Sequence, residues 1–181
     1  DNKTGEYKEE TTIVTYYYDR IPAEVKYNEV SKKATNTKVT SINDAFNYTI
    51  KYKTELNEYE GKAVITIVDA LSHPINVEKS SLAGGIYNEE TLTITWKKEY
   101  DVNTYNQENS IIELNYNITI YYENLNPEER VIVNNVKTKL ELETIDPITS
   151  EDKTETDLEV KGKVIIKYYD KQNNEIAKSD T

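Results

Sequence analysis

The sequence predicts an all-β protein of half-buried antiparallel strands, with enough residues to fill the core of a β-sandwich. Apolar residues are only 36% of the 181-residue chain, yet they recur in alternating runs, the pattern of strands with one buried face. Sixteen Tyr accompany one Phe and one Trp, and Tyr, Thr, Val and Ile suit a pleated, partly exposed surface. No segment has the apolar stripe of a useful helix, and residues 24–34, which come nearest, lack a convincing one.

The first strands are separated by a proline. Residues 11–19 are rich in β-branched and aromatic side chains, which predicts a strand. Pro22 has no N–H to donate to a neighbouring strand, so it marks a boundary. Residues 23–32 then alternate, and Lys32 falls on the same face as Val30.

A turn-rich polar connection over residues 35–44 leads to a strand over residues 46–52. Alternate side chains of this strand are apolar and share one face, which we assign to the core. These side chains are Phe46, Tyr48, Ile50 and Tyr52.

The next strand, over residues 63–71 after a turn at residues 57–61, carries a carboxylate on its buried face. Asp69 shares the parity of Ile65 and Ile67, and successive strand side chains point to opposite faces. Burial of an isolated ionised carboxylate is so unfavourable that the group becomes protonated or finds a partner. Asp69 therefore belongs either to a polar network or to a site of chemistry.

Two further strands complete the middle of the chain. A loop from Ser72 to residues 84–85 precedes a strand over residues 92–96, whose Trp96 faces the core. A polar loop over residues 101–109 then leads to a long strand over residues 111–122.

The last strong strand, over residues 131–143, repeats the situation of Asp69. Asn134 shares the parity of Ile132 and Val136, so it points inward. Asn135 faces outward.

The C-terminal part is more polar. Residues 145–161 indicate a linker or an exposed edge, and residues 162–170 predict a strand followed by a turn at residues 171–174. The segment at residues 165–170 weakly echoes residues 14–19, which hints at neighbouring repeats in a longer array.

Charge and composition exclude several classes of function. The net charge of −11 disfavours nucleic acid and anionic membranes as partners, because both select clustered Lys and Arg, and it favours simple solubility. Without Cys the chain has neither a disulfide nor a thiolate metal site. No window approaches a membrane span, and no signal peptide is present, so we expect an internal fragment whose anchor lies outside it.

The three inward polar residues suggest a self-contained reaction. Burial lowers the pKa of Lys32 toward the neutral, nucleophilic amine and raises that of Asp69 toward the neutral acid. The acid could polarise the side-chain carbonyl of Asn134 and pass a proton to the departing NH2, leaving a Lys32–Asn134 amide and ammonia.

A plainer interpretation stays open. An inward Lys at a strand end often reaches solvent with its amine, and an inward Asp or Asn often satisfies loop backbone. A register slip of one residue would also turn any of the three side chains outward.

Six segments, taken in order, resemble the isopeptide-forming, immunoglobulin-like domains of Gram-positive surface adhesins and pilins, of the collagen-adhesin A-region type. They lie between about Pro22 and Glu143: residues 30–32 (VSK), 46–50 (FNYTI), 65–71 (ITIVDAL), 80–87 (SSLAGGIY), 93–96 (TITW) and 134–136 (NNV). The resemblance implies an immunoglobulin-like antiparallel sandwich with extra terminal strands.

In that family a Lys on the first strand bonds an Asn on the last, with an Asp on the opposing sheet as catalyst. The resemblance implies these roles for Lys32, Asn134 and Asp69, with Lys33 and Asn135 as runners-up. Ser72-His73 stands where the family has a Pro-containing turn, which puts the loop conformation in question.

The two ends are similar to mucin-binding-type repeats. We therefore predict the closing strand of one repeat over residues 1–21 and the cross-linking sandwich over residues 22–144. Residues 145–161 would be the linker or edge, and residues 162–181 the opening of a second repeat.

The leading hypothesis is a structural stalk module of a cell-wall-anchored, extracellular adhesin, whose partners are neighbouring modules. The alternative is a domain that binds a host glycan or matrix protein through exposed Tyr, Trp96 or the loop at residues 84–85. Apart from the single-turnover cross-link, no enzyme, cofactor or metal site is expected, since His73 is the only His and no phosphate-binding Gly motif occurs.

Overall fold

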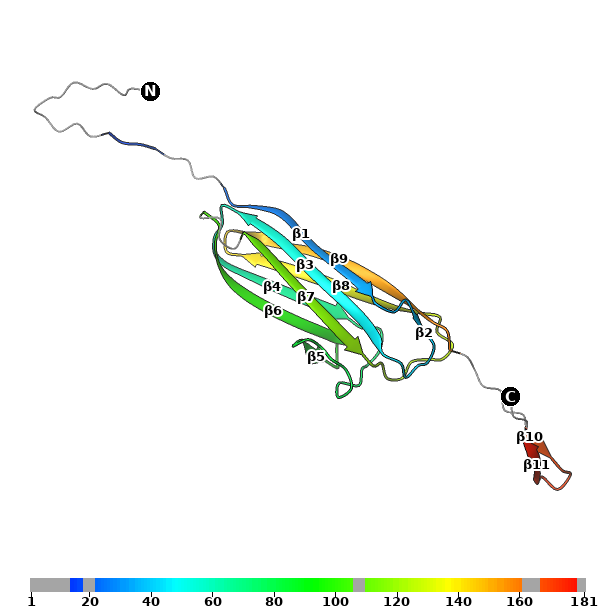
Figure 1. Cartoon of the computed structure of the whole chain (residues 1–181). Helices are drawn as coiled ribbons and strands as arrows, with labels where there is room; N and C mark the ends of the chain where they lie inside the picture. The colour runs from blue at the N-terminus through cyan, green and yellow to red at the C-terminus, as the bar shows by residue number, and fades with distance from the viewer. Residues whose placement is uncertain (1–13, 18–21, 106–109, 161–166, 179–181) are drawn as a thin grey trace, which may run out of the picture.

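Two facing sheets and a separate hairpin make up the computed structural model, which describes residues 14–17, 22–105, 110–160 and 167–178 (Figure 1). One sheet has three strands in the order β1-β3-β7, and the other has six in the order β2-β9-β8-β4-β6-β5. The strands are β1 (Glu24–Ala34), β2 (Lys38–Val39), β3 (Phe46–Asn57), β4 (Glu60–Ala70), β5 (Ile86–Asn88), β6 (Thr93–Asn103), β7 (Ile111–Ile120), β8 (Val131–Leu142), β9 (Ile145–Leu158), β10 (Lys167–Tyr169) and β11 (Glu175–Lys178). Their pairings are antiparallel apart from the short parallel pairing of β2 with β9. The predicted all-β sandwich is confirmed.

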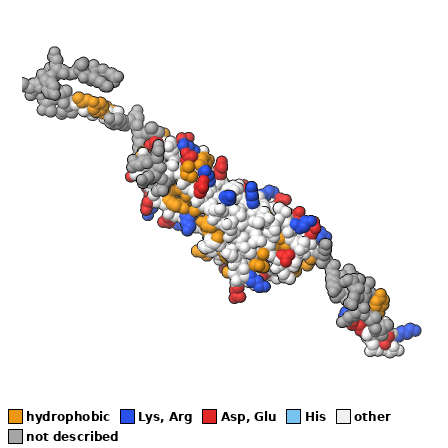
Figure 2. All heavy atoms as spheres, viewed as in Figure 1, with side chains coloured by type: hydrophobic (Ala, Val, Ile, Leu, Met, Phe, Trp, Pro, Cys, Tyr) orange, Lys and Arg blue, Asp and Glu red, His pale blue; other side chains and the backbone are white. Residues whose placement is uncertain are grey.

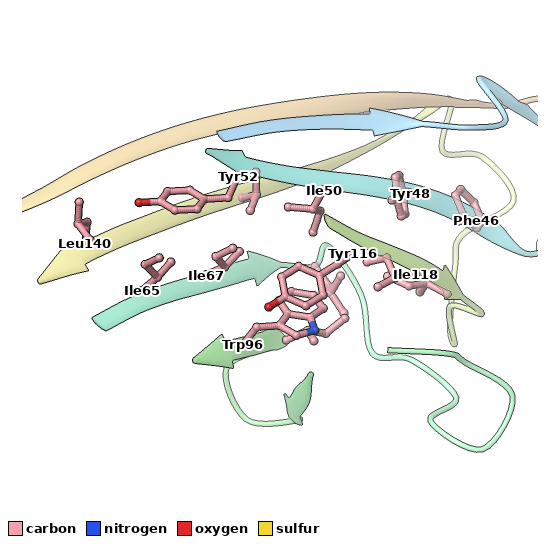
Figure 3. Close-up of a cluster of buried hydrophobic side chains, with 14 of the residues drawn as sticks. Phe46, Tyr48, Ile50, Tyr52, Ile65, Ile67, Trp96, Tyr116, Ile118 and Leu140 are labelled. Atoms are coloured by element: carbon pink, nitrogen blue, oxygen red, sulfur yellow. The ribbon is translucent and has the colours of Figure 1, made fainter. Parts of the chain in front are cut away.

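The core lies between the two sheets and follows the alternation of the sequence. Phe46, Tyr48, Ile50 and Tyr52 of β3 are at most 1% exposed, as predicted. In Figure 3 the side chains of β3 line the space between the two sheets, and Tyr52 extends toward Leu140 of the other sheet. Each sheet therefore buries one face and exposes the other.

The chain crosses the sandwich from one end to the other (Figure 1). Pro22, just before β1, lines the same hollow as Ile145 at the start of β9. At the other end, Val39 pairs with Leu158, the last residue of β9. β1 and β9 thus lie side by side, in different sheets, and run in the same direction. We call the two ends of the sandwich the Pro22 end and the Leu158 end.

Strand β9 extends the sandwich beyond the boundary predicted at residue 144. Of the two interpretations of residues 145–161, the structure shows an edge, because β9 pairs with β8 along nearly its whole length. Only Thr156 and Leu158 of β9 are buried. On the side of β9 away from β8, the short strand β2 pairs only with the last two residues of β9, Asp157 and Leu158.

The structure describes the two terminal segments only in part. Of the strand predicted over residues 11–19, residues 14–17 are described and are not in a strand, and the rest lies outside the described residues. Near the C-terminus, β10 and β11 form a hairpin around the predicted turn, where Asp170 accepts backbone hydrogen bonds from Gln172 and Asn174. The described part of the chain has no helix long and apolar enough to cross a membrane.

The exposed surface of the sandwich carries charges of both signs. On the face shown in Figure 2, basic and acidic side chains are interspersed over the sandwich. Several Lys residues lie in exposed ion pairs, for example Lys53 with Glu113 and Lys137 with Glu151. Such exposed pairs contribute little to the stability of the fold.

Candidate functional site: a buried amine, carboxylate and amide

The three predicted site residues come from three strands and meet inside the sandwich toward the Leu158 end. Lys32 lies near the end of β1, Asp69 near the end of β4 and Asn134 near the start of β8. Their exposed fractions are 4%, 0% and 0%. β4 and β8 are neighbours, and Asp69 is opposite Val136, so Asp69 and Asn134 project from the same sheet. Lys32 reaches them from the other sheet.

One carboxylate contacts both potential reactants. Lys32 Nζ donates a hydrogen bond to Asp69 Oδ1, and the two side chains form an ion pair that is completely buried. Asn134 Nδ2 lies 3.5 Å from the other carboxylate oxygen, Asp69 Oδ2. The amine and the amide are therefore held on the two oxygens of a single acid, as a proton-transfer group between them requires.

Burial shifts both titrating groups toward their neutral forms. Desolvation lowers the pKa of Lys32 to about 8, although the charges of Asp69 and Asp152 act in the opposite direction. Desolvation likewise raises the pKa of Asp69, and Lys32 opposes that shift. The pair thus holds one proton that either partner can carry, and the neutral-amine, neutral-acid form becomes accessible.

Aromatic side chains enclose the site. Lys32 Nζ lies 4.7 Å from the ring centroid of Tyr48, and the Tyr122 hydroxyl lies 3.5 Å from Asn134 Nδ2. Tyr122 in turn packs edge-on against Phe46 and His73. This wall separates the amine and the amide from bulk water.

Two contributors were missed by sequence reasoning. Asp152 of β9 accepts a hydrogen bond from the backbone N–H of Lys32 (2.7 Å) and so fixes the end of β1 against β9. Nothing in a segment interpreted as a linker or edge marks that residue. Tyr122 could have been found, because it continues the buried parity of Ile118 and Ile120.

The neighbouring candidates point away from the site. Lys33 and Asn135 are exposed, in line with the alternation of β1 and β8. Of these four candidates, only Lys32 and Asn134 are buried in the core.

One expectation from the family resemblance needs correction. Asn134 is not on the last strand of the sandwich, because β8 is followed by β9 in the same sheet. Lys32 and Asn134 therefore lie on the first and the penultimate strand of the sandwich.

Trp96 is not available as a ligand contact. It is 3% exposed, donates its indole N–H to the carbonyl of Leu82 (3.0 Å) and stacks on Tyr116. A Cβ atom on Gly85 would lie 2.6 Å from Trp96 Cε2, so only glycine fits there. The loop and Trp96 form a packed unit.

Among the described residues, no group of three or more His, Asp or Glu side chains is placed so that it could bind a metal ion. His73 pairs instead with Glu129 (3.2 Å) and with the hydroxyl of Ser72 (2.9 Å).

Comparison with known proteins gives structural similarity only. No protein-family model and no curated protein matches the sequence. The fold is similar to the collagen-binding domain of a Staphylococcus aureus adhesin, at 10% identity over 71% of this chain and 96% of that one, with a TM-score of 0.38. It is also similar to the collagen-binding subdomain of the Enterococcus faecalis surface protein ACE, at 10% identity over 73% of this chain and 98% of that one (TM-score 0.36). The major subunit of aggregative adherence fimbriae type I from Escherichia coli matches at 12% identity over 81% of this chain and 100% of that one (TM-score 0.36).

Proposed function

We propose that this sandwich is a structural module of a bacterial cell-surface adhesin that forms an intramolecular isopeptide bond between Lys32 and Asn134. The observation that carries the proposal is the completely buried Asp69, whose two oxygens contact the amine and the amide. The extracellular, wall-anchored setting and the flanking repeats follow from the sequence resemblance and belong to the same proposal.

The chemistry is an amide exchange that needs no cofactor. Neutral Lys32 Nζ attacks Asn134 Cγ while protonated Asp69 hydrogen-bonds to the side-chain carbonyl oxygen. The attacking amine passes one proton to Asp69, and Asp69 supplies one proton to the departing NH2. The Cγ–Nδ2 bond breaks, the Nζ–Cγ bond remains, and ammonia leaves. Fixed geometry replaces a bimolecular encounter, and the apolar wall keeps water from competing.

The product bond would join the two sheets across the core. Lys32 and Asn134 are 102 positions apart (134 − 32). By analogy with a disulfide that closes a loop of this size, the bond stabilises the fold by roughly 4 to 5 kcal/mol. That amount is a large part of the stability of an ordinary domain.

The intact mass of the denatured protein tests this proposal. The purified chain should be lighter than its sequence mass by one ammonia, and a cross-linked peptide containing Lys32 and Asn134 should appear on digestion. Lys32→Ala and Asn134→Ala should each have the full mass expected for the variant. Lys33→Ala and Asn135→Ala are the matched controls, because these adjacent side chains are exposed, and both should still lose ammonia. A wild-type chain at full mass would refute the cross-link.

Cross-linking should be fastest at intermediate pH. At low pH both Lys32 and Asp69 are protonated, so the amine is not nucleophilic. At high pH the pair loses its shared proton, so Asp69 cannot act as an acid. In a plot of cross-linking rate against pH, the rise on the acid side should lie above the usual pKa of an Asp, because burial raises the pKa of Asp69. The fall on the alkaline side should lie near the lowered pKa of Lys32, about 8.

The other ionisable groups that face the pair are Asp152 on β9, Tyr48 on β3 and Tyr122 after β7. Burial raises the pKa of both tyrosines, so they stay neutral across this range. Rates measured by mass after synthesis at each pH give the profile. A rate that rises steadily into the alkaline range would show that Asp69 does not act as an acid.

A further inference from the structure

One atom of the reactive amide, the side-chain carbonyl oxygen of Asn134, lacks a hydrogen-bond donor in the described part of the chain. Asn134 Oδ1 is buried, and no group in the described residues donates a hydrogen bond to it. Attack on Asn134 Cγ would place a full negative charge on this oxygen in the tetrahedral intermediate. A buried oxyanion without donors would prevent the reaction, so the site must supply some.

Two groups already meet the other terminal atom of the same side chain. Asn134 Nδ2 lies 3.5 Å from Asp69 Oδ2 and 3.5 Å from the Tyr122 hydroxyl oxygen. The two terminal atoms of an Asn are similar in size, so a half-turn about the Cβ–Cγ bond exchanges them. In that orientation Oδ1 faces both the protonated Asp69 and the hydroxyl of Tyr122.

Tyr122 is well suited to act as a permanent donor. It is 6% exposed, and its ring is fixed against Phe46 with centroids 5.0 Å apart. Burial, followed by the proximity of Tyr48 and Asp69, raises the pKa of Tyr122 well above its usual value. The hydroxyl therefore keeps its proton at neutral and mildly alkaline pH.

We infer that Tyr122 is a second catalytic residue, whose hydroxyl donates a hydrogen bond to Asn134 Oδ1 and stabilises the oxyanion together with Asp69. The inference rests on the proposed cross-link. It assigns Asp69 to proton transfer and one hydrogen bond, and Tyr122 to the second hydrogen bond. No proton moves from Tyr122, so the balance of the reaction is unchanged.

The test is the rate of ammonia loss in Tyr122→Phe, which keeps the ring and removes only the donor. The full chain is made by cell-free synthesis, synthesis is stopped, and aliquots are denatured in acid at intervals for intact-mass measurement. Loss of one oxyanion donor should slow cross-linking on the order of 100-fold, so the uncross-linked chain should accumulate. The ratio of wild-type to variant rates should not change with pH, because the Tyr122 hydroxyl does not titrate.

Tyr59→Phe is the matched control. Tyr59 is also buried, at 1% exposed, and its hydroxyl donates to the Lys62 carbonyl (2.7 Å). Tyr59 lines the hollow at the Pro22 end, away from the site. This variant should lose stability while keeping the wild-type rate. Thermal unfolding of both substitutions in a Lys32→Ala background, where no bond can form, measures their structural effect separately.

The outcomes separate the two proposals. If the wild-type chain never loses ammonia, both the cross-link and the catalytic role of Tyr122 are refuted. If the wild-type chain cross-links and Tyr122→Phe does so at the same rate, only the role of Tyr122 is overturned. A slowed Tyr122→Phe that is matched by an equally slowed Tyr59→Phe would also overturn it, because general destabilisation would then explain both.

Discussion

Asp69→Asn is expected to abolish the loss of ammonia and to leave the protein less stable than any other single variant of the site. The amide keeps the size of the side chain but cannot transfer protons, and general acid–base catalysis of this kind contributes about 10²- to 10⁴-fold. The substitution also leaves Lys32 buried without its counter-charge, because the Asp69 side chain is its buried ion-pair partner. Removal of one member of a buried pair costs roughly 3 to 5 kcal/mol.

A double variant separates the two effects. Lys32→Met combined with Asp69→Asn removes the buried amine as well, so it should be more stable than Asp69→Asn alone by roughly 3 kcal/mol. Asn134→Ala is the control that lacks the bond and keeps the ion pair. Chemical denaturation should therefore rank wild type first, then Asn134→Ala and the double variant, and Asp69→Asn last. If Asp69→Asn unfolded together with Asn134→Ala, Lys32 would not depend on Asp69 in the folded state.

The parts of the fold that the sequence predicts are the strands along which buried and exposed residues alternate. Strand β3 and the inward side of β8 were identified because buried and exposed residues alternate there without interruption. Strand β9 was left between two interpretations, because only two of its side chains are buried and it is held mainly by backbone pairing with β8. Backbone hydrogen bonds leave no mark on composition, so a polar edge strand resembles a linker.

The site was predictable in part for the same reason. Parity showed that Lys32, Asp69 and Asn134 point inward, and the structure adds that they converge. Parity could not show that Asp152 fixes the backbone of Lys32, because that contact joins the edges of two different sheets and two residues 120 positions apart. Long-range contacts between edge strands are set by sheet packing, which a local pattern does not encode.

The position of the bond determines how the module would carry tension. In a stalk module, load would enter at the Pro22 end through β1 and leave at the Leu158 end through β9. A bond from Lys32 to Asn134 places residues 33–133 inside a closed loop, which cannot extend. Strand β9 and most of β8 stay outside that loop, so β9 is held by its pairing with β8 and by the hydrogen bond from Lys32 N–H to Asp152. If the proposed bond forms, covalent protection would therefore be complete for most of the core and absent for the last strand.

Single-molecule stretching from the two ends should show this division directly. From Glu24 to Leu158 the chain spans 134 positions (158 − 24), and the bond would bypass 102 of them, leaving 32. At about 3.4 Å per extended residue, the wild-type sandwich should release at most about 110 Å, whereas Asn134→Ala should release at most about 460 Å. Asn135→Ala keeps the bond and should match the wild type. A wild-type chain that released the full length would have no bond, and one that released no length before covalent rupture would show that β9 is secured in some other way.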